Sequence, residues 1–168
     1  MIEERSDFES GVGSGDRIEL RVWLRLLTCT NLLDNAIRQR LKQAADTTLP
    51  RFDILAQLER HGAPMSMGEL SRRLMVSNGN VTGLIDRLAR EGYVERAPDP
   101  SDRRVQMVSL TTEGTKFFGE IAEDHRKWVG DMMAGLSASE MRSLYALLAR
   151  LKESIRAADD DNSLEAAE

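Results

Sequence analysis

Two short segments with helical periodicity, residues 67–74 and 77–91, are separated only by a tight turn at residues 75–77. So short a connection makes the two helices one structural unit, which constrains the fold more than any other feature of the chain. In the second helix, apolar residues recur at i, i+3, i+4 and i+7 and share a face that we expect to be buried: Val81, Leu84, Ile85 and Leu88. The spacing predicts a helix-turn-helix.

The opposite face of this second helix has an unusual composition for a solvated surface. It presents Gly79 and Gly83, and each exposed helical glycine costs about 1 kcal/mol relative to alanine. Close approach of another molecule to the helix backbone would explain that cost. At the amino end, Ser77, Asn78 and Asn80 are suited to contact DNA phosphates or base edges. Alternatively, Ser77 only caps the helix and the asparagines only satisfy its first turn. The other members of this face are Asp86 and Arg90, with Thr82, Asn80 and Arg87 at its edges.

A β-hairpin is predicted directly after the helix pair. Residues 93–97 and 105–110 are rich in β-branched, aromatic or long apolar side chains, and the loop PDPSDRR joins them. By itself, a loop with two prolines, two aspartates and two arginines is typical of a solvated turn. Beside a helix-turn-helix, however, a basic hairpin makes a winged helix, whose loop can insert an arginine into a DNA minor groove.

Further helices flank the winged helix on both sides. Apolar residues at spacings of three and four predict a long helix from residue 16 or 17 to about 45. Pro50 suits the first turn of the next helix, and Gly62 follows its end. Ser137 with Glu140 forms a capping box for the last helix. The predicted fold class is therefore mainly α with a small β-hairpin, a winged helix-turn-helix domain combined with an α-helical region.

Charge is distributed unevenly along the chain. The formal net charge is -5, but residues 1–16 carry -4 and residues 157–168 carry -5, so residues 17–156 retain +4. Both acidic ends lack sustained apolar periodicity, and we expect flexible tails there. The folded part is mildly basic, so the acidic total does not argue against a nucleic-acid partner.

Composition disfavours several other classes of protein. No apolar run approaches the roughly 20 residues of a membrane helix, and the acidic amino end is unlike a signal peptide, so we expect a cytoplasmic protein without membrane contact. One cysteine and two distant histidines, His61 and His125, give no metal-ligand spacing, and no metal site is expected. Neither a nucleophile elbow nor a phosphate-binding glycine loop appears, so we expect no enzymatic activity and no cofactor.

The run from residue 65 to residue 117 resembles the MarR (multiple-antibiotic-resistance regulator) family of winged-helix transcription factors. In that family the wing has the pattern Asp-x-Arg followed by a strand that ends in Leu-Thr, and the matching residues here are Asp102, Arg104, Leu110 and Thr111. The resemblance covers residues 17–156. It implies a winged helix-turn-helix at about 49–111 and dimerisation helices at about 17–45 and 112–156.

The resemblance also implies a homodimer that binds a pseudo-palindromic operator in double-stranded DNA, because two recognition helices then reach successive major-groove faces. The long first helix and the last two helices contain more apolar surface than a small winged-helix core can cover. Candidates for the dimer contact are Leu144, Leu148, Leu151 and Ile155. Each of these residues fits an internal core equally well.

The resemblance implies specific roles for the wing loop. Arg104 is expected to enter the minor groove, Asp102 to hold it by a charge-assisted hydrogen bond, and Arg103 to meet phosphate. Many family members have a basic residue where this chain has Gly83, so the resemblance does not extend to base reading at that position. The expected DNA-binding residues are Ser77, Asn78, Asn80, Thr82, Arg87, Asp102, Arg103 and Arg104.

In the resembled family, small ligands bind between the dimer helices and the winged-helix lobe. The ligand-binding candidates here are Trp23, Leu27, Asn31, Arg38, Phe52, His125 and Trp128. Each also fits ordinary core packing, because pockets and cores use the same residue types. The stretch VSNGNVTGLIDRL resembles a branch that controls the catabolism of hydroxycinnamates and related aromatic acids, some members of which sense acyl-CoA thioesters. Arg38, with Arg40 and Lys42, is suited to phosphate contacts or else forms a solvated helix face.

The sequence therefore predicts a ligand-responsive, DNA-binding transcriptional regulator: a repressor released from its operator by a small aromatic acid or its CoA thioester. Two alternatives stay open. Another branch of the family senses oxidants through a cysteine in its first helices, which would make Cys29 the switch, although its place in an apolar stripe predicts burial. A helical adaptor that does not bind DNA is the other alternative, but it would not need Asp102 and Arg104 on a hairpin.

Overall fold

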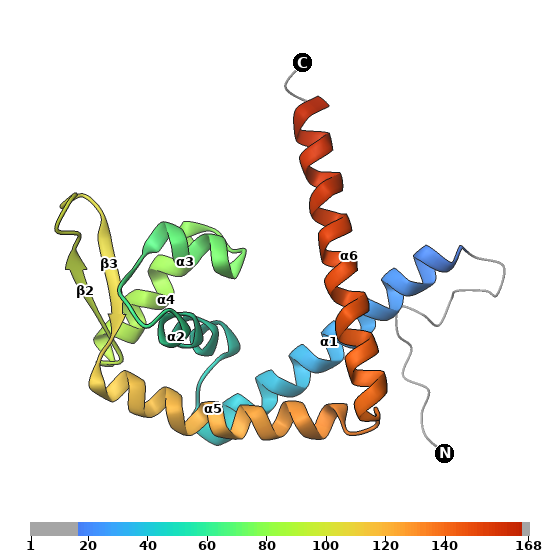
Figure 1. Cartoon of the computed structure of the whole chain (residues 1–168). Helices are drawn as coiled ribbons and strands as arrows, with labels where there is room; N and C mark the ends of the chain where they lie inside the picture. The colour runs from blue at the N-terminus through green and yellow to red at the C-terminus, as the bar shows by residue number, and fades with distance from the viewer. Residues whose placement is uncertain (1–16, 166–168) are drawn as a thin grey trace. The chain divides into compact units, whose positions relative to one another are not determined.

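The computed structural model describes residues 17–165. The chain divides into two compact units, Met1–Trp128 and Val129–Glu168, and the fifth helix contributes to both. The elements (Figure 1) run in the order α1 (Ile18–Ala45), α2 (Leu49–His61), β1 (Met65–Ser66), α3 (Met67–Leu74), α4 (Asn78–Arg90), β2 (Val94–Pro98), β3 (Gln106–Leu110), α5 (Thr112–Met133) and α6 (Ala138–Glu165).

The core of the first unit lies between α2, the helix-turn-helix and the sheet. Val81, Ile85 and Leu88 of α4 are fully buried, while Leu84 is half-buried and packs at the edge of the core. The predicted mainly α fold with a winged helix-turn-helix is confirmed. The core cluster consists of Ile54, Leu55, Leu58, Met65, Leu70, Val81, Ile85, Leu88, Val94 and Val108.

The sheet has a strand that the sequence did not predict. β1 pairs antiparallel with β3, with Met65 opposite Val108, and β3 lies between β1 and β2. A two-residue strand is too short to display a period-two pattern. Its pairing therefore depends on the tertiary packing that carries Met65 into the core, where its side chain is fully buried.

The turn and cap signals predicted from the sequence are confirmed. Gly62 ends α2 in the left-handed conformation with φ 69°, and Pro50 lies in the first turn of that helix. At the start of α6, the Glu140 amide donates to Ser137 Oγ at 3.3 Å, and the Ser137 amide donates to Glu140 Oε2 at 2.8 Å. This reciprocal pair is a capping box. The Ser137 hydrogen bonds also lower the pKa of the Glu140 carboxyl.

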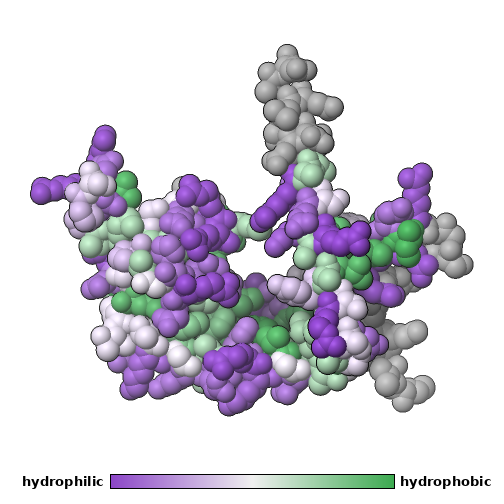
Figure 2. All heavy atoms as spheres, in the orientation of Figure 1, coloured by the Kyte–Doolittle hydropathy of each residue, from purple (hydrophilic) through white to green (hydrophobic). Residues whose placement is uncertain are grey.

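The predicted burial of Cys29 is wrong, because this side chain is exposed. The buried residues of α1 are Thr28, Ile37 and Leu41. The buried apolar residues of α1 thus lie toward its carboxyl end, whereas Ile18, Leu20, Val22 and Trp23 near its amino end are exposed. Figure 2 shows apolar surface in this part of the molecule. Periodicity identifies an apolar face correctly but does not say whether the same chain covers it.

The helix α6 extends further than the sequence indicated. An acidic tail was expected from residue 157, yet α6 continues to Glu165. Adding residues to an existing helix avoids the costly nucleation step, so residues without apolar periodicity can still be helical there. The tail expected at residues 1–16, and residues 166–168 of the second tail, lie outside the described residues.

The second unit exposes a large amount of apolar surface along α6. The exposed large side chains on this helix are Leu144, Tyr145, Leu147, Leu148, Leu151 and Ile155.

In the part of the chain that is described, no helix combines the length and the apolar character needed to cross a membrane.

Candidate functional site

The helix α4 presents a polar surface opposite its buried face. Asn80, Thr82 and Arg87 are exposed, as is Ser77, which occupies the N-cap position. The Ser77 hydroxyl makes no capping hydrogen bond, so the first amides of α4 are not satisfied by this side chain. Asn78 is the first residue of the helix.

Gly79 and Gly83 have no packing reason to be glycine within the described chain. A Cβ atom built on either residue would meet no described atom within 4 Å. Each glycine nevertheless costs a helix about 1 kcal/mol relative to alanine. The open space beside both residues is consistent with close approach of another molecule to the backbone of α4.

We call β2, β3 and the loop at residues 99–105 the wing. Asp99 Oδ1 accepts hydrogen bonds from the Ser101 amide (2.7 Å), the Ser101 hydroxyl (2.5 Å) and the Asp102 amide (3.2 Å). These bonds lower the pKa of the Asp99 carboxyl, the Ser101 side-chain bond having the largest effect. The loop is therefore folded by its own side chains, and Asp99 is an organising residue that the sequence did not single out.

Arg104 is held by Asp102, as the family resemblance implied. Asp102 Oδ1 accepts from the Arg104 amide at 3.0 Å and from its Nε at 3.2 Å. The Arg104 side chain is 92% exposed, and Arg103 is exposed too. Figure 2 shows hydrophilic residues gathered at the tip of the hairpin. The wing therefore presents an arginine whose direction is fixed by an adjacent carboxylate while its guanidinium faces solvent.

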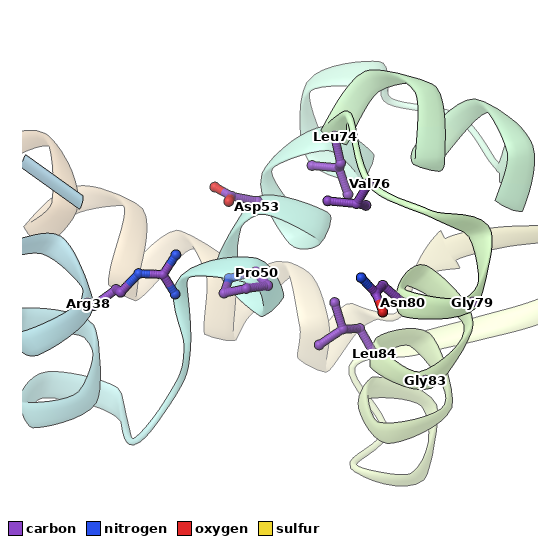
Figure 3. Close-up of a pocket in the computed structure, with 9 residues that line it drawn as sticks. All are labelled: Arg38, Pro50, Asp53, Leu74, Val76, Gly79, Asn80, Gly83 and Leu84. Atoms are coloured by element: carbon purple, nitrogen blue, oxygen red, sulfur yellow. The ribbon is translucent and has the colours of Figure 1, made fainter. Parts of the chain in front are cut away.

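A cavity of about 590 Å³ lies beside the exposed face of α4. In Figure 3 Arg38 lies on one side of it and the residues of α4 lie on the other. Gly79, Asn80 and Gly83 belong both to the cavity wall and to the exposed face of the helix. A molecule in this cavity would therefore touch residues that a partner of α4 would also reach. The lining residues are Arg38, Pro50, Asp53, Leu74, Val76, Gly79, Asn80, Gly83 and Leu84.

The seven ligand-binding candidates do not gather at one cavity. Arg38 lines the large one, and His125 lines a second of about 250 Å³ between α1 and α5. The Phe52 ring is buried and stacks on His125 with centroids 4.6 Å apart. The sequence missed most of the wall, because Leu74, Val76 and Leu84 have the pattern of ordinary core residues. Trp23, Leu27, Asn31 and Trp128 are not among the residues that line these two cavities.

Two opposite charges flank the large cavity. The Arg38 Nε donates to Asp34 Oδ2 at 2.7 Å. The pKa of the Asp53 carboxyl is raised to about 6, mainly by burial and in part by Asp34, while Arg38 opposes the shift. Asp53 could not be singled out from the sequence, because an aspartate in the first turns of a helix is common.

The raised pKa of Asp53 predicts a pH-dependent stability. The folded state holds the proton more tightly than the unfolded state, so this stabilisation is complete below about pH 4 and is lost as the pH rises through about 6. Asp53→Asn should therefore stabilise the protein above pH 6, by about 1 kcal/mol after allowance for solvent screening at a half-buried site. Urea unfolding between pH 4.5 and 7.5 measures the change, with the exposed Asp124→Asn as control. A difference between Asp53→Asn and wild type that stays constant over this range would contradict the interpretation.

Comparisons with known proteins agree on one family. The model of the MarR family matches residues 47–105. The chain is 29% identical over 170 residues to the transcriptional activatory protein BadR of Rhodopseudomonas palustris, covering 99% of this chain and 97% of BadR. It is 35% identical over 127 residues to the uncharacterized HTH-type transcriptional regulator YcgE of Bacillus subtilis, covering 75% of this chain and 71% of YcgE. A cysteine-to-serine variant of MarR from E. coli, solved in complex with operator DNA, superposes with a TM-score of 0.70 at 30% identity, covering 79% of this chain and 95% of that chain.

Proposed function

This chain belongs to the MarR family of transcriptional regulators, and from that premise we propose that it is a homodimeric regulator that binds a DNA operator through α4 and the wing and releases it when a small aromatic acid binds. The observation that carries the DNA-binding part is the pairing of an exposed Arg104, fixed by Asp102, with an exposed polar face on α4. The superposition with the operator-bound MarR structure supports the same partner.

The side chains and backbone amides of α4 and the wing favour DNA rather than protein as the partner of this surface. Ser77, Asn78 and Asn80 stand at the amino end of α4, where uncapped backbone amides favour phosphate oxygens. Thr82 and Arg87 lie further along the helix, and the glycines allow its backbone to approach the duplex closely. Arg103 and Arg104 then reach the backbone and the minor groove. The part of the chain from residue 17 to residue 156 carries the net positive charge that such a contact needs.

Two exposed apolar surfaces support a homodimer. In the first unit, Ile18, Val22 and Trp23 of α1 are 47 to 61% exposed. In the second unit, α6 exposes the row that contains Leu144, Leu148, Leu151 and Ile155, together with Tyr145 and Leu147. Exposed apolar surface of this extent on a water-facing helix favours burial against a second copy. Two copies related by a twofold axis would match a pseudo-palindromic operator.

The large cavity supports the effector part of the proposal. Arg38 can pair with a carboxylate, and Pro50, Leu74 and Leu84 offer apolar surface to an aromatic ring. An effector bound there would occupy space beside Gly79, Asn80 and Gly83, and so would favour a state of the protein in which α4 does not fit DNA. A CoA thioester of the same acid is included in the proposal, with Arg40 and Lys42 as candidate phosphate ligands.

The sign of regulation has two candidates. We propose repression, in which DNA occupancy blocks transcription and the effector relieves it. Activation is the second candidate, because the relative BadR is named an activatory protein. In vitro transcription from the bound promoter distinguishes them: added protein lowers transcript yield in the first case and raises it in the second.

Oxidant sensing through Cys29 gains support from the exposure of this side chain. It requires that peroxide release the wild-type protein from DNA and that Cys29→Ser abolish this release.

The proposed function is tested by selection of duplexes from a random library, followed by release assays. We expect the wild-type protein to select a pseudo-palindrome and an aromatic acid to weaken its binding. Arg38→Ala should keep DNA affinity but reduce sensitivity to the acid about tenfold or more, because a charge-assisted hydrogen bond is lost. Arg126→Ala is a matched control, since Arg126 is also an exposed arginine that pairs with a carboxylate one helical turn away, and it lies outside the large cavity. If no duplex is enriched, the proposal that this protein binds DNA is overturned. If both variants respond equally to the acid, the proposal that the acid binds in the large cavity is overturned.

A further inference from the structure

The strand β2 carries an arginine that contacts α4. Nη2 of Arg96 pairs with Asp86 Oδ1 at 2.5 Å and donates to the backbone carbonyl oxygen of Thr82 at 3.5 Å. Thr82 and Asp86 are four residues apart, so a single guanidinium contacts two positions one turn apart on the helix. The Arg96 side chain is 30% exposed and that of Asp86 is 50% exposed. This contact ties the wing directly to α4.

The carboxylate in this pair lies on the face of α4 that is proposed to meet DNA. Asp86 follows Gly79 by seven residues and Gly83 by three, which puts all three on one side of the helix. An unpaired carboxylate there would repel the phosphates of the duplex. The Arg96 guanidinium lies against that carboxylate and neutralises it without removing it from the surface.

A second arginine lies in the same turn. The Arg90 Nε donates to the backbone carbonyl oxygen of Asp86 at 3.3 Å. Asp86, Ala89, Arg90 and Arg96 together line a surface groove. With both arginines present the local net charge is +1, and without Arg96 it falls to zero. The net positive charge of this group of three side chains therefore depends on Arg96.

We propose that Arg96 is a positioning residue for DNA binding, which neutralises Asp86 on the DNA-facing side of α4 and holds the wing against that helix. The inference rests on the proposed DNA-binding function and deepens it. It differs from the role of Arg104, because Arg96 acts through Asp86 and Thr82 rather than by entering a groove. Exposed ion pairs usually contribute little to the free energy of unfolding. Loss of the Arg96–Asp86 pair should therefore lower DNA affinity while leaving folding stability nearly unchanged.

A double-mutant cycle with Arg96→Gln and Asp86→Asn tests the inference, using a duplex that the wild-type protein has selected from a random library. Arg96→Gln should weaken binding about tenfold or more at low salt, since two pairs are lost in each dimer. Asp86→Asn should bind as tightly as wild type or more tightly. The double variant should lie closer to wild type than Arg96→Gln alone, because no carboxylate is left unpaired.

The salt dependence of DNA affinity and the conservative variant Arg96→Lys distinguish a positioning role of Arg96 from a purely structural one. The loss in Arg96→Gln should shrink as ionic strength rises, since the repulsion of a bare Asp86 is screened, whereas a misfolded wing would lose affinity at every salt concentration. Arg96→Lys should recover part of the affinity, because it keeps the charge but not the two-point contact. Arg126→Gln is the matched control, as Arg126 pairs with Glu123 at 2.6 Å on α5.

Three outcomes would overturn this inference without overturning the proposed function. The first is wild-type affinity in Arg96→Gln. The second is an equal loss in the single and double variants, which would mean that Arg96 contacts DNA directly. The third is a loss in Asp86→Asn as large as that in Arg96→Gln, which would mean that Asp86 itself contacts DNA. Absence of DNA binding by the wild-type protein would instead overturn the proposed function and this inference with it. Thermal unfolding and size-exclusion chromatography establish that each variant is folded and dimeric.

Discussion

Arg104→Ala should weaken binding to the selected operator about 100-fold, because each half-site of a symmetric dimer loses a charge-assisted contact. The loss should be largest on operators with A/T-rich flanks, where a narrow minor groove has the most negative potential. Arg104 is suited to this role because its side chain is 92% exposed while Asp102 fixes its direction. Affinities on A/T-rich and G/C-rich flanks over a salt series measure the effect.

Arg87→Ala provides the contrast. Arg87 lies on α4 with its side chain 63% exposed, 4.0 Å from Glu91. If it contacts phosphate, its loss should weaken all sequences alike, and the slope of log affinity against log salt should flatten by about 2 for the dimer. If the Arg104→Ala protein is folded and dimeric and still binds both kinds of operator as tightly as wild type, the wing loop is only a solvated turn.

Gly114→Ala should have the largest effect on stability, a loss of about 3 kcal/mol or more in the free energy of unfolding. A Cβ atom at residue 114 would lie 1.9 Å from the carbonyl oxygen of Tyr93 and 2.8 Å from its carbonyl carbon. Both are backbone atoms, so rotation of a side chain cannot relieve the clash. The same oxygen accepts from the Thr111 amide at 3.1 Å, which holds the start of α5 in place.

Gly119→Ala is the matched control for Gly114→Ala. It lies on the same helix, and a Cβ atom there meets no described atom within 4 Å. Since alanine is the better helix former, this variant should gain up to about 1 kcal/mol. Urea unfolding of both variants gives the comparison. A Gly114→Ala protein as stable as Gly119→Ala would show that the α5 terminus moves away from Tyr93 at little cost.

Local signals in the sequence identified most of the fold. The tight turn at residues 75–77, the apolar face of α4 and the β-branched and apolar residues of the wing strands are all signals within a few residues of one another. Capping by Ser137 and Glu140 is local for the same reason. The wing contact between Asp102 and Arg104 was anticipated from the family pattern, and its two partners are only two residues apart.

The large cavity could not be found in the same way. Its wall comes from α1, α2, the end of α3 and α4, so its residues are spread from Arg38 to Leu84. Periodicity reports that Leu74 and Leu84 are apolar but not that they border open space. The shift in the pKa of Asp53 likewise depends on burial by other elements and on Asp34, 19 residues earlier in the chain.

The sequence by itself determined the order of the helices, the helix-turn-helix, the wing and the residues that the wing loop exposes, because each of these depends on short-range periodicity, turn chemistry and charge. Only the tertiary structure decided which apolar faces are covered, as the exposed Cys29 demonstrates. It also decided that β1 completes the sheet, that Gly114 meets Tyr93 and that Arg96 reaches Asp86. These contacts join residues 10 to 43 positions apart, and such pairs meet only after the intervening chain has folded.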